Sequence, residues 1–260
     1  MVRKSSLLLV TIGGVGCLQE GRAPQPWKPA PVAFERTLLG YSVQGRPIDA
    51  YSYGWGADPV LVFGGFHGNE KASVHVAEKL IALLQGNSAL PAGRSVVIVP
   101  NVNPDGYERN SRQNARGVDL NRNFPAANWK ASEPGNSSHG GSAPLSEPEA
   151  QIVLDLVGEL KPSLIISIHS ISRNRQCNNF DGPGRAVARR MATRNGYPVK
   201  ASIGYATPGS FGTWAGKELQ IPTVTLELPR PADANQCWAD NRGALMAAFQ
   251  GPLDDRALGK

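Results

Sequence analysis

The sequence predicts an α/β fold in a single domain, with a central sheet covered by helices on both faces. Short, continuously apolar segments recur along the chain, as expected for strands buried on both sides, and amphipathic segments of helical length separate them. In addition, 29 glycines and 21 prolines among 260 residues argue against a coiled coil or a simple helix bundle. The chain is long enough to bury a full core without disulfide bonds.

Four strands and four helices carry this prediction. Apolar runs of strand length predict strands at 60–63, 96–99, 164–168 and 223–228. Apolar residues at helical spacing predict helices at 71–84, from 146 onward, at 186–195 and at 241–250. Ser146 and Glu149 have the spacing of a capping box, so we expect Ser146 to be the N-cap of the second helix. In sheets of this kind, reactive side chains gather where strands end in loops.

The beginning of the chain has the layout of an export signal, which we assign to residues 1–16. Arg3 and Lys4 form a basic start, residues 7–12 are an apolar stretch, and residues 14–16 are small. We therefore expect an exported, periplasmic protein. The alternative is a short apolar N-terminus that does not join the fold.

Cys17 follows this segment directly, and the arrangement resembles a bacterial lipoprotein signal in which that cysteine would carry a lipid anchor. Residues 17–31 are rich in proline and predict an extended tether, which leaves 32–255 as the folded domain. An oxidising compartment would allow a disulfide between Cys177 and Cys237. A disulfide and two buried thiols both remain open, because sequence does not give the distance between the two Cα atoms.

Charge and hydropathy exclude two classes of partner. The 27 Lys and Arg residues exceed the 21 Asp and Glu residues, for a formal net charge of +6. These basic residues are scattered rather than gathered into a stripe with interleaved aromatics, so we expect no nucleic-acid partner. Because no apolar run approaches the roughly 20 residues that a bilayer requires, we also expect no membrane span.

Two of the predicted strands are followed by residues that can bind a metal ion. His67 and Glu70 come after the strand at 60–63, and His169 comes directly after the strand at 164–168. Two histidines and one glutamate are a ligand set of catalytic zinc sites, in which a fourth position stays open. For His67 and Glu70 taken alone, ordinary hydrogen-bonded loop residues are the alternative.

The other two histidines are expected at the surface rather than as ligands. His75 lies five residues after Glu70 on a predicted helix, which is not the i, i+4 spacing of a helical zinc motif. His139 lies in a polar, glycine-rich loop.

A third segment supplies the pattern that points to a family. Residues 101–106 read NVNPDG, Arg112 follows, and residues 117–125 read GVDLNRNFP. With the candidate ligands and a further acid in the strand at 223–228, Glu227, these motifs resemble the zinc carboxypeptidase family. The resemblance implies a mixed, mostly parallel central sheet with helices on both faces, one Zn²⁺ per chain and a peptide substrate with a free carboxylate.

Within that family, residues 124–130 and 204–214 most resemble bacterial members that hydrolyse the amide between γ-D-glutamate and meso-diaminopimelate in murein peptides. The stretch from Glu70 to His169 is shorter than in the digestive members, so their side-chain preferences do not transfer. Three alternatives remain: a general metallocarboxypeptidase that releases C-terminal residues, a zinc deacylase of N-acyl amino acids, and an inactive wall-binding module.

The resemblance also implies a role for each residue of the reacting centre. His67, Glu70 and His169 would hold the zinc ion. Glu227 would be the general base, which takes a proton from water and delivers it to the leaving amine. Arg112 would stabilise the oxyanion, a role suited to a permanently charged donor.

Four further residues would bind substrate or position these groups. Asn121 and Arg122 would grip the carboxylate beside the cleaved bond, which a guanidinium can do through two parallel hydrogen bonds. Tyr205 would close over the substrate. Asp119 would orient a zinc-bound imidazole from behind.

Overall fold

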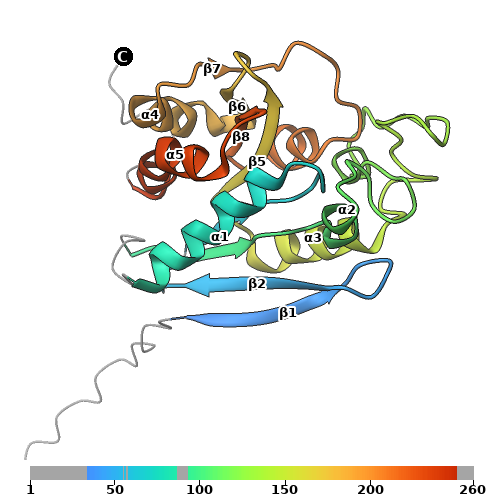
Figure 1. Cartoon of the computed structure of the whole chain (residues 1–260), viewed down its shortest axis with the longest axis horizontal. Coiled ribbons are helices and arrows are strands. Elements are labelled where there is room, and N and C mark those ends of the chain that lie inside the picture. The colour runs from blue at the N-terminus through green and yellow to red at the C-terminus, as the bar shows by residue number, and fades with distance from the viewer. Residues whose placement is uncertain (1–33, 55, 57, 87–92, 251–260) are drawn as a thin grey trace, which may run out of the picture. The chain divides into compact units, whose positions relative to one another are not determined.

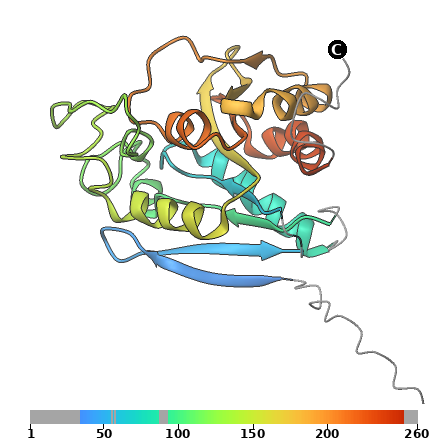
Figure 2. The same ribbon diagram turned by 180° about the vertical axis from the view of Figure 1, so that it is seen from behind.

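A mixed sheet of eight strands organises the described part of the chain (Figures 1 and 2). The computed structural model describes residues 34–54, 56, 58–86 and 93–250. The predicted export signal, Cys17 and the proline-rich tether therefore lie outside the described residues. In sheet order the strands are β1 (Glu35–Tyr41), β2 (Pro47–Tyr53), β4 (Val96–Val99), β3 (Val60–Phe63), β5 (Leu164–Ser172), β8 (Thr223–Arg230), β6 (Cys177–Asp181) and β7 (Val199–Lys200).

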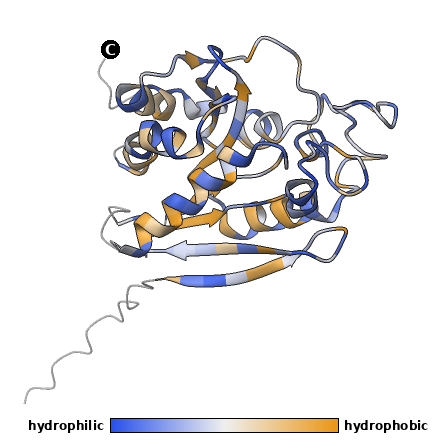
Figure 3. Cartoon of the chain, viewed as in Figure 1, coloured by the Kyte–Doolittle hydropathy of each residue, from blue (hydrophilic) through white to orange (hydrophobic). Residues whose placement is uncertain are grey.

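The middle of the sheet is parallel and its flanks are mixed. Strands β4, β3, β5 and β8 pair parallel to one another, whereas β2 joins β4 and β6 joins β8 in the antiparallel sense. In Figure 3 β4 is coloured as hydrophobic, whereas β2, nearer the edge of the sheet, is paler. The predicted single-domain α/β fold with a mixed, mostly parallel sheet is confirmed.

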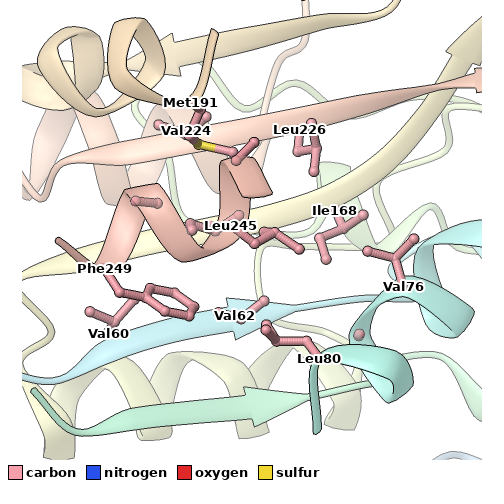
Figure 4. Close-up of a cluster of buried hydrophobic side chains, with 14 of the residues drawn as sticks. Val60, Val62, Val76, Leu80, Ile168, Met191, Val224, Leu226, Leu245 and Phe249 are labelled. Carbon is pink, nitrogen blue, oxygen red and sulfur yellow. The ribbon is translucent and has the colours of Figure 1, made fainter. Parts of the chain in front are cut away.

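Helices pack on both faces of the sheet. They are α1 (Lys71–Gly86), α2 (Pro104–Glu108), α3 (Pro148–Leu160), α4 (Arg185–Asn195) and α5 (Ala234–Phe249), with short turns η1 (Leu120–Arg122), η2 (Gly182–Gly184) and η3 (Thr213–Glu218). On one face, α1, α4 and α5 bury a core against alternate residues of the inner strands, as Figure 4 shows for Val60, Val62, Val76, Leu80, Ile168, Met191, Val224, Leu226, Leu245 and Phe249.

The opposite face is covered by α3, η3 and aromatic residues of the connecting loops. Phe66, Phe124, Phe211 and Trp214 form a chain of ring contacts whose centroids lie 5.0 to 6.0 Å apart. This aromatic cluster packs beside the loops that follow β3 and η1. Because these side chains are buried, they fix the loops that carry the candidate site residues.

The structure corrects the predicted end of one strand and the predicted start of one helix, and a neighbouring contact explains each difference. Strand β5 continues through His169 to Ser172, because it pairs with β8 as far as Ser172 opposite Arg230. His169 is therefore inside a strand and not at its end. Helix α5 begins at Ala234, well before the predicted position 241, because the Asp233 side chain caps it by accepting from the backbone N–H of Gln236 at 2.8 Å.

The capping box predicted at Ser146 is wrong. The helix begins at Pro148, its N-cap is Glu147, and no side chain caps it. The hydroxyl of Ser146 instead donates to Glu147 Oε1 at 2.9 Å and accepts from Asn123 at 3.0 Å. The hydroxyl is thus used to hold the loop that carries Asn123.

The two remaining cysteines of the sequence are separate thiols. Cys177 on β6 and Cys237 on α5 are both buried and unpaired, so of the two alternatives the structure has two thiols and no disulfide. Burial raises the pKa of Cys177 to about 11, with a smaller contribution from Glu227. Within the described part of the chain, no helix combines the length and apolar character that crossing a bilayer requires.

Candidate active site

The three predicted metal ligands converge on one point. Nδ1 of His67 lies 2.9 Å from Glu70 Oε1 and 3.2 Å from Nδ1 of His169, and Nδ1 of His169 lies 3.2 Å from Glu70 Oε2. Ligand atoms bound at about 2.0 to 2.2 Å around a tetrahedral ion are about 3.3 to 3.6 Å apart. All three side chains are buried, and their ligand atoms fall within 4.8 Å of one another. The donor set and its spacing therefore fit one zinc ion.

Local structure brings these ligands together from two neighbouring strands. His67 and Glu70 lie in the turn between β3 and α1, and His169 projects from β5. The turn packs so closely on α2 that a Cβ at Gly68 would sit 1.9 Å from the carbonyl carbon of Gly106, so glycine is required at position 68. On the strand side, the backbone N–H of Ser170 donates to Glu70 Oε2 at 2.9 Å.

Asp119 fixes the orientation of the first imidazole. Its Oδ1 lies 2.9 Å from Nε2 of His67. A carboxylate can only accept here, so the proton of a neutral His67 sits on Nε2 and the lone pair of Nδ1 faces Glu70 and His169. Asp119 is completely buried and also caps η1 by accepting from the backbone N–H of Asn121 at 3.0 Å.

Arg112 stands beside the ligands on the other side of the same carboxylate. It donates from Nε and Nη2 to Asp119 Oδ2 at 3.0 and 2.8 Å. Its Nη1 is left 3.3 Å from Nδ1 of His67 and 3.9 Å from Glu70 Oε1. The guanidinium is thus held rigidly with one amino group directed at the metal-ligand cluster.

Charges within the cluster oppose the effect of burial. Burial would raise the pKa of Glu70 and of Asp119. His67 and His169 hold the pKa of Glu70 well below its usual range, and His67, Arg112 and Arg122 do the same for Asp119. Burial lowers the pKa of His169. For His67, burial acts in the same direction but Glu70 and Asp119 outweigh it, so its pKa is raised. One ionised carboxylate and two imidazoles are ligand types that suit a zinc ion.

Glu227 lies next to the ligands on the adjacent strand. It is in register with His169, so the two side chains leave the sheet side by side on one face. It is 6% exposed, and burial, followed by the charge of Glu70, raises its pKa to about 8. His67, Arg112 and Arg122 act against this rise. A bound cation would favour the carboxylate form further.

Asn121 and Arg122 follow Asp119 in the single turn of η1. Asn121 Oδ1 accepts from the backbone N–H of Phe211 at 2.9 Å, and its Nδ2 lies 3.4 Å from Nε2 of His169. Arg122 is 5% exposed, and its charge favours the ionised forms of both Asp119 and Glu227, although burial still raises the pKa of Glu227. A buried guanidinium near these acids is a ready partner for a substrate carboxylate.

A cavity of about 530 Å³ opens beside these residues and is called the polar pocket here. Half-exposed Tyr205 lines this pocket, and the centre of its ring lies 6.0 Å from Cζ of Arg175. Most of the polar side chains that line the pocket come from β6, β8, η1 and the segment 201–217: Asn121, Asn179, Asp181, Tyr205, Ser210, Thr213, Lys217, Thr225 and Glu227.

The structure therefore brings together all nine predicted site residues and keeps the other two histidines apart. His75 is partly buried on α1, and its Nε2 lies 3.0 Å from Oδ1 of Asn235. His139 is not at the surface as predicted: it is 9% exposed, and its Nδ1 lies 2.7 Å from the backbone oxygen of Ser132.

One positioning residue had no role assigned from sequence. Asn103 accepts from the backbone N–H of Gly106 at 2.8 Å and donates to the backbone oxygens of Phe66 and Arg112 at 3.2 and 3.4 Å. It therefore ties the segment before His67 to the segment that carries Arg112. The only sequence signal was its place in the NVNPDG motif.

This fold and this metal-ligand cluster define a zinc peptidase: residues 30–239 match the zinc carboxypeptidase family, and the chain belongs to that family. Murein peptide amidase A of Escherichia coli K12 is 35% identical over 207 residues, which cover 75% of this chain and 80% of that protein. The crystal structure of murein-tripeptide amidase MpaA from Escherichia coli O157 superposes with a TM-score of 0.67 at 30% identity, covering 84% of this chain and 93% of that chain. Bovine thrombin-activatable fibrinolysis inhibitor shares the fold, with a TM-score of 0.72 at 21% identity, covering 83% of this chain and 89% of that chain.

Proposed function

We propose that the protein is a zinc-dependent amide hydrolase that cleaves the bond between γ-D-glutamate and meso-diaminopimelate in murein peptides. The observation that carries this proposal is the convergence of His67, Glu70 and His169 on one point, with Glu227 beside them. Similarity to the murein peptide amidases over most of both chains supports the choice of substrate. The sequence identity to these amidases, 30 to 35%, is higher than the 21% identity to the bovine protein that shares the fold.

In this proposal the chain's own residues manage the proton, while the zinc ion supplies a Lewis acid that polarises the amide carbonyl and acidifies water. Glu227 takes the proton from the attacking water and delivers it to the leaving nitrogen. Its buried position supports this role, because a raised pKa makes a carboxylate a stronger base.

Arginine and amide groups would bind the charges of the substrate. Arg112, held by Asp119, would offer its Nη1 amino group to the oxyanion that forms from the carbonyl. Asn121 and Arg122 bind the carboxylate on the carbon that bears the leaving nitrogen. Tyr205 closes over the occupied site.

We also propose that residues 1–16 direct export and that 17–31 tether the catalytic domain, 32–255, which would place the enzyme at cell-wall peptide in the periplasm. Fractionation of cells that produce the full chain tests this. Recovery in the cytoplasm would contradict export. If Cys17 carries a lipid, the protein should move from the membrane fraction to the soluble periplasmic fraction when Cys17 is replaced by Ser.

Product analysis tests the proposed reaction. Zinc-loaded protein is incubated with L-Ala-γ-D-Glu-meso-diaminopimelate, and the products are separated by mass spectrometry. We expect L-Ala-D-Glu and free diaminopimelate, and loss of the reaction when a chelator removes zinc. A chelator-treated sample that is reloaded with zinc is the control.

Two parallel substrates separate the alternatives. Release of C-terminal residues from ordinary α-linked peptides, with the murein peptide left intact, would indicate a general metallocarboxypeptidase. Cleavage of N-acyl amino acids alone would indicate a deacylase. Either result would contradict the murein proposal.

A further inference from the structure

The polar pocket extends far beyond the point at which the amide would be cut. Its floor is the strand pair β6 and β8, in which Asn179 is opposite Thr225 and Asp181 is opposite Thr223. These residues face the same side of the sheet as Glu227, which lies four positions from Thr223 along β8. Two residues of a strand span about 6.6 Å, so four span about 13 Å. Asp181, opposite Thr223, therefore lies about 13 Å from Glu227 along the strand direction. The pocket can therefore receive a long side chain.

A buried carboxylate that forms an ion pair with Lys217 marks the far end of the pocket. Asp181 is 8% exposed, and its Oδ1 lies 3.3 Å from Nζ of Lys217, whose side chain is 56% exposed. The turn of η3 packs tightly on this carboxylate: a Cβ at Gly212 would be 2.5 Å from Asp181 Oδ2, and one at Gly216 would be 2.5 Å from Asp181 Cβ. Burial raises the pKa of Asp181, and Lys217 acts against the rise. The fold thus holds a carboxylate in a place where a second cation would stabilise it.

An unsatisfied acceptor lies between the two ends. Asn179 is 8% exposed and lines the pocket, and its buried Oδ1 has no hydrogen-bond partner among the described residues. Buried polar atoms without a partner are uncommon, because leaving one unpaired costs free energy. A donor on a ligand in the pocket would satisfy it.

We infer that Asp181, Asn179 and Lys217 select a leaving residue whose far end carries both an ammonium and a carboxylate group. Asp181 and Asn179 Oδ1 accept from the ammonium group, and Lys217 pairs with the carboxylate. This inference rests on the proposed function and deepens it, since it explains how a 2,6-diamino dicarboxylic acid is told from a plain diamino acid. An aromatic side chain would leave Asn179 Oδ1 without a partner and would offer Asp181 no second cation.

Three matched peptides test the inference. L-Ala-γ-D-Glu is linked to meso-diaminopimelate, to L-lysine, which lacks the far carboxylate, or to L-2-aminopimelate, which lacks the far ammonium. We expect kcat/KM to be about 10- to 100-fold higher for the first than for either of the others, the range for one charged hydrogen bond. Equal values on all three peptides would overturn the inference.

Two variants should change the preference in opposite directions. In Lys217→Met the diaminopimelate peptide should lose about 10- to 100-fold, while the lysine peptide should gain because Asp181 is released to its ammonium group. In Asp181→Asn the aminopimelate peptide should gain instead, because Lys217 is released. Lys79→Met, at an exposed position of α1, is the control and should change nothing. A uniform loss on all three peptides in both variants would show a structural role only and would contradict the inference.

A binding measurement separates this inference from the proposed function. Calorimetry with the zinc-loaded protein compares free meso-diaminopimelate, L-lysine and L-2-aminopimelate. Tighter binding of free meso-diaminopimelate than of the other two, reduced in both variants, would support the pocket assignment even if no peptide is cleaved. Absence of cleavage would overturn only the proposed reaction. Cleavage of all three peptides with no preference in rate or binding would overturn only the pocket assignment.

Discussion

Asp119 joins three parts of the candidate site through one carboxylate. One oxygen holds the imidazole of His67 and the turn of η1, and the other holds the guanidinium of Arg112. A buried carboxylate is stable in this position because each oxygen has donors that offset its desolvation. The orientation of a metal ligand and that of the oxyanion donor are therefore coupled.

Most single residues of the site were predictable, because their chemistry is unusual for their position. A glutamate in an apolar strand, such as Glu227, is costly unless it has a function. Asp181 and Lys217 were not predictable. A polar residue in a short strand and a lysine in a loop are ordinary, and their meaning depends on a strand pairing that the sequence pattern did not indicate.

Replacement of Glu227 by Gln should remove the proton acceptor and leave the metal ligands intact. We expect full zinc content and a loss of about 10² to 10⁴ in kcat. Metal analysis and steady-state kinetics check this, with Glu78→Gln at an exposed position of α1 as the control. Full activity in the Glu227 variant would show that another group is the base.

The same residue predicts how the rate depends on pH. Only ionised Glu227 can accept a proton, so kcat/KM of the wild type should fall as the pH drops through the pKa of this group. That pKa is raised to about 8 by burial and Glu70 in the protein without a cation, and zinc should lower it. A rate that stays constant from alkaline to acid pH would contradict the assignment.

Arg122→Ala should weaken substrate binding more than it slows the chemical step. Its guanidinium binds a carboxylate that does not react, so KM should rise by a larger factor than kcat falls. Steady-state kinetics on the murein tripeptide measure both constants. An unchanged KM would exclude Arg122 as a carboxylate ligand.

At the scale of elements, the strands in the middle of the sheet and the helices that cover them were predictable, and the strands at its edges were not. Buried parallel strands such as β3 and β4 read as continuous apolar runs. β1 is largely exposed and β6 carries polar residues into the pocket, so neither has that signal. The missed strand β6 contains the residues on which the pocket depends.

One contact between elements should govern stability without touching the site. Asp105 on α2 is completely buried and accepts from Ser42, from the backbone N–H of Gln44 and from Arg46, which together form the turn between β1 and β2. We expect Asp105→Ala to lower the free energy of unfolding by about 3 kcal/mol, because buried donors lose a charged acceptor. Denaturant unfolding measures this, with exposed Asp155→Ala as the control. A change below about 1 kcal/mol would contradict it.

At the scale of the whole molecule, two cores on opposite faces hold the parallel strands while the loops at one edge carry the chemistry. Such a sheet needs no covalent crosslink, which agrees with the two separate thiols. The sequence could not decide between a disulfide and two thiols, because the pairing depends on the distance between β6 and α5. That distance is set by packing and not by local pattern.

A count of reactive thiols tests this description. The chain with Cys17 replaced by Ser, unfolded without reductant, should show two thiols from Cys177 and Cys237. In the folded protein both should react slowly, because they are buried and the pKa of Cys177 is raised to about 11. Thiols that become detectable only after reduction would establish a disulfide.

Anomalous X-ray scattering at the zinc absorption edge, from crystals of the zinc-loaded protein, tests whether His67, Glu70 and His169 hold one zinc ion. We predict one strong peak per chain, about 2.0 to 2.2 Å from Nδ1 of His67, Nδ1 of His169 and a carboxylate oxygen of Glu70. Crystals of His169→Ala serve as the control and should show that peak weakened or lost. A fully loaded crystal whose peak lies elsewhere, or persists unchanged in the variant, would show that these three residues do not form the zinc site.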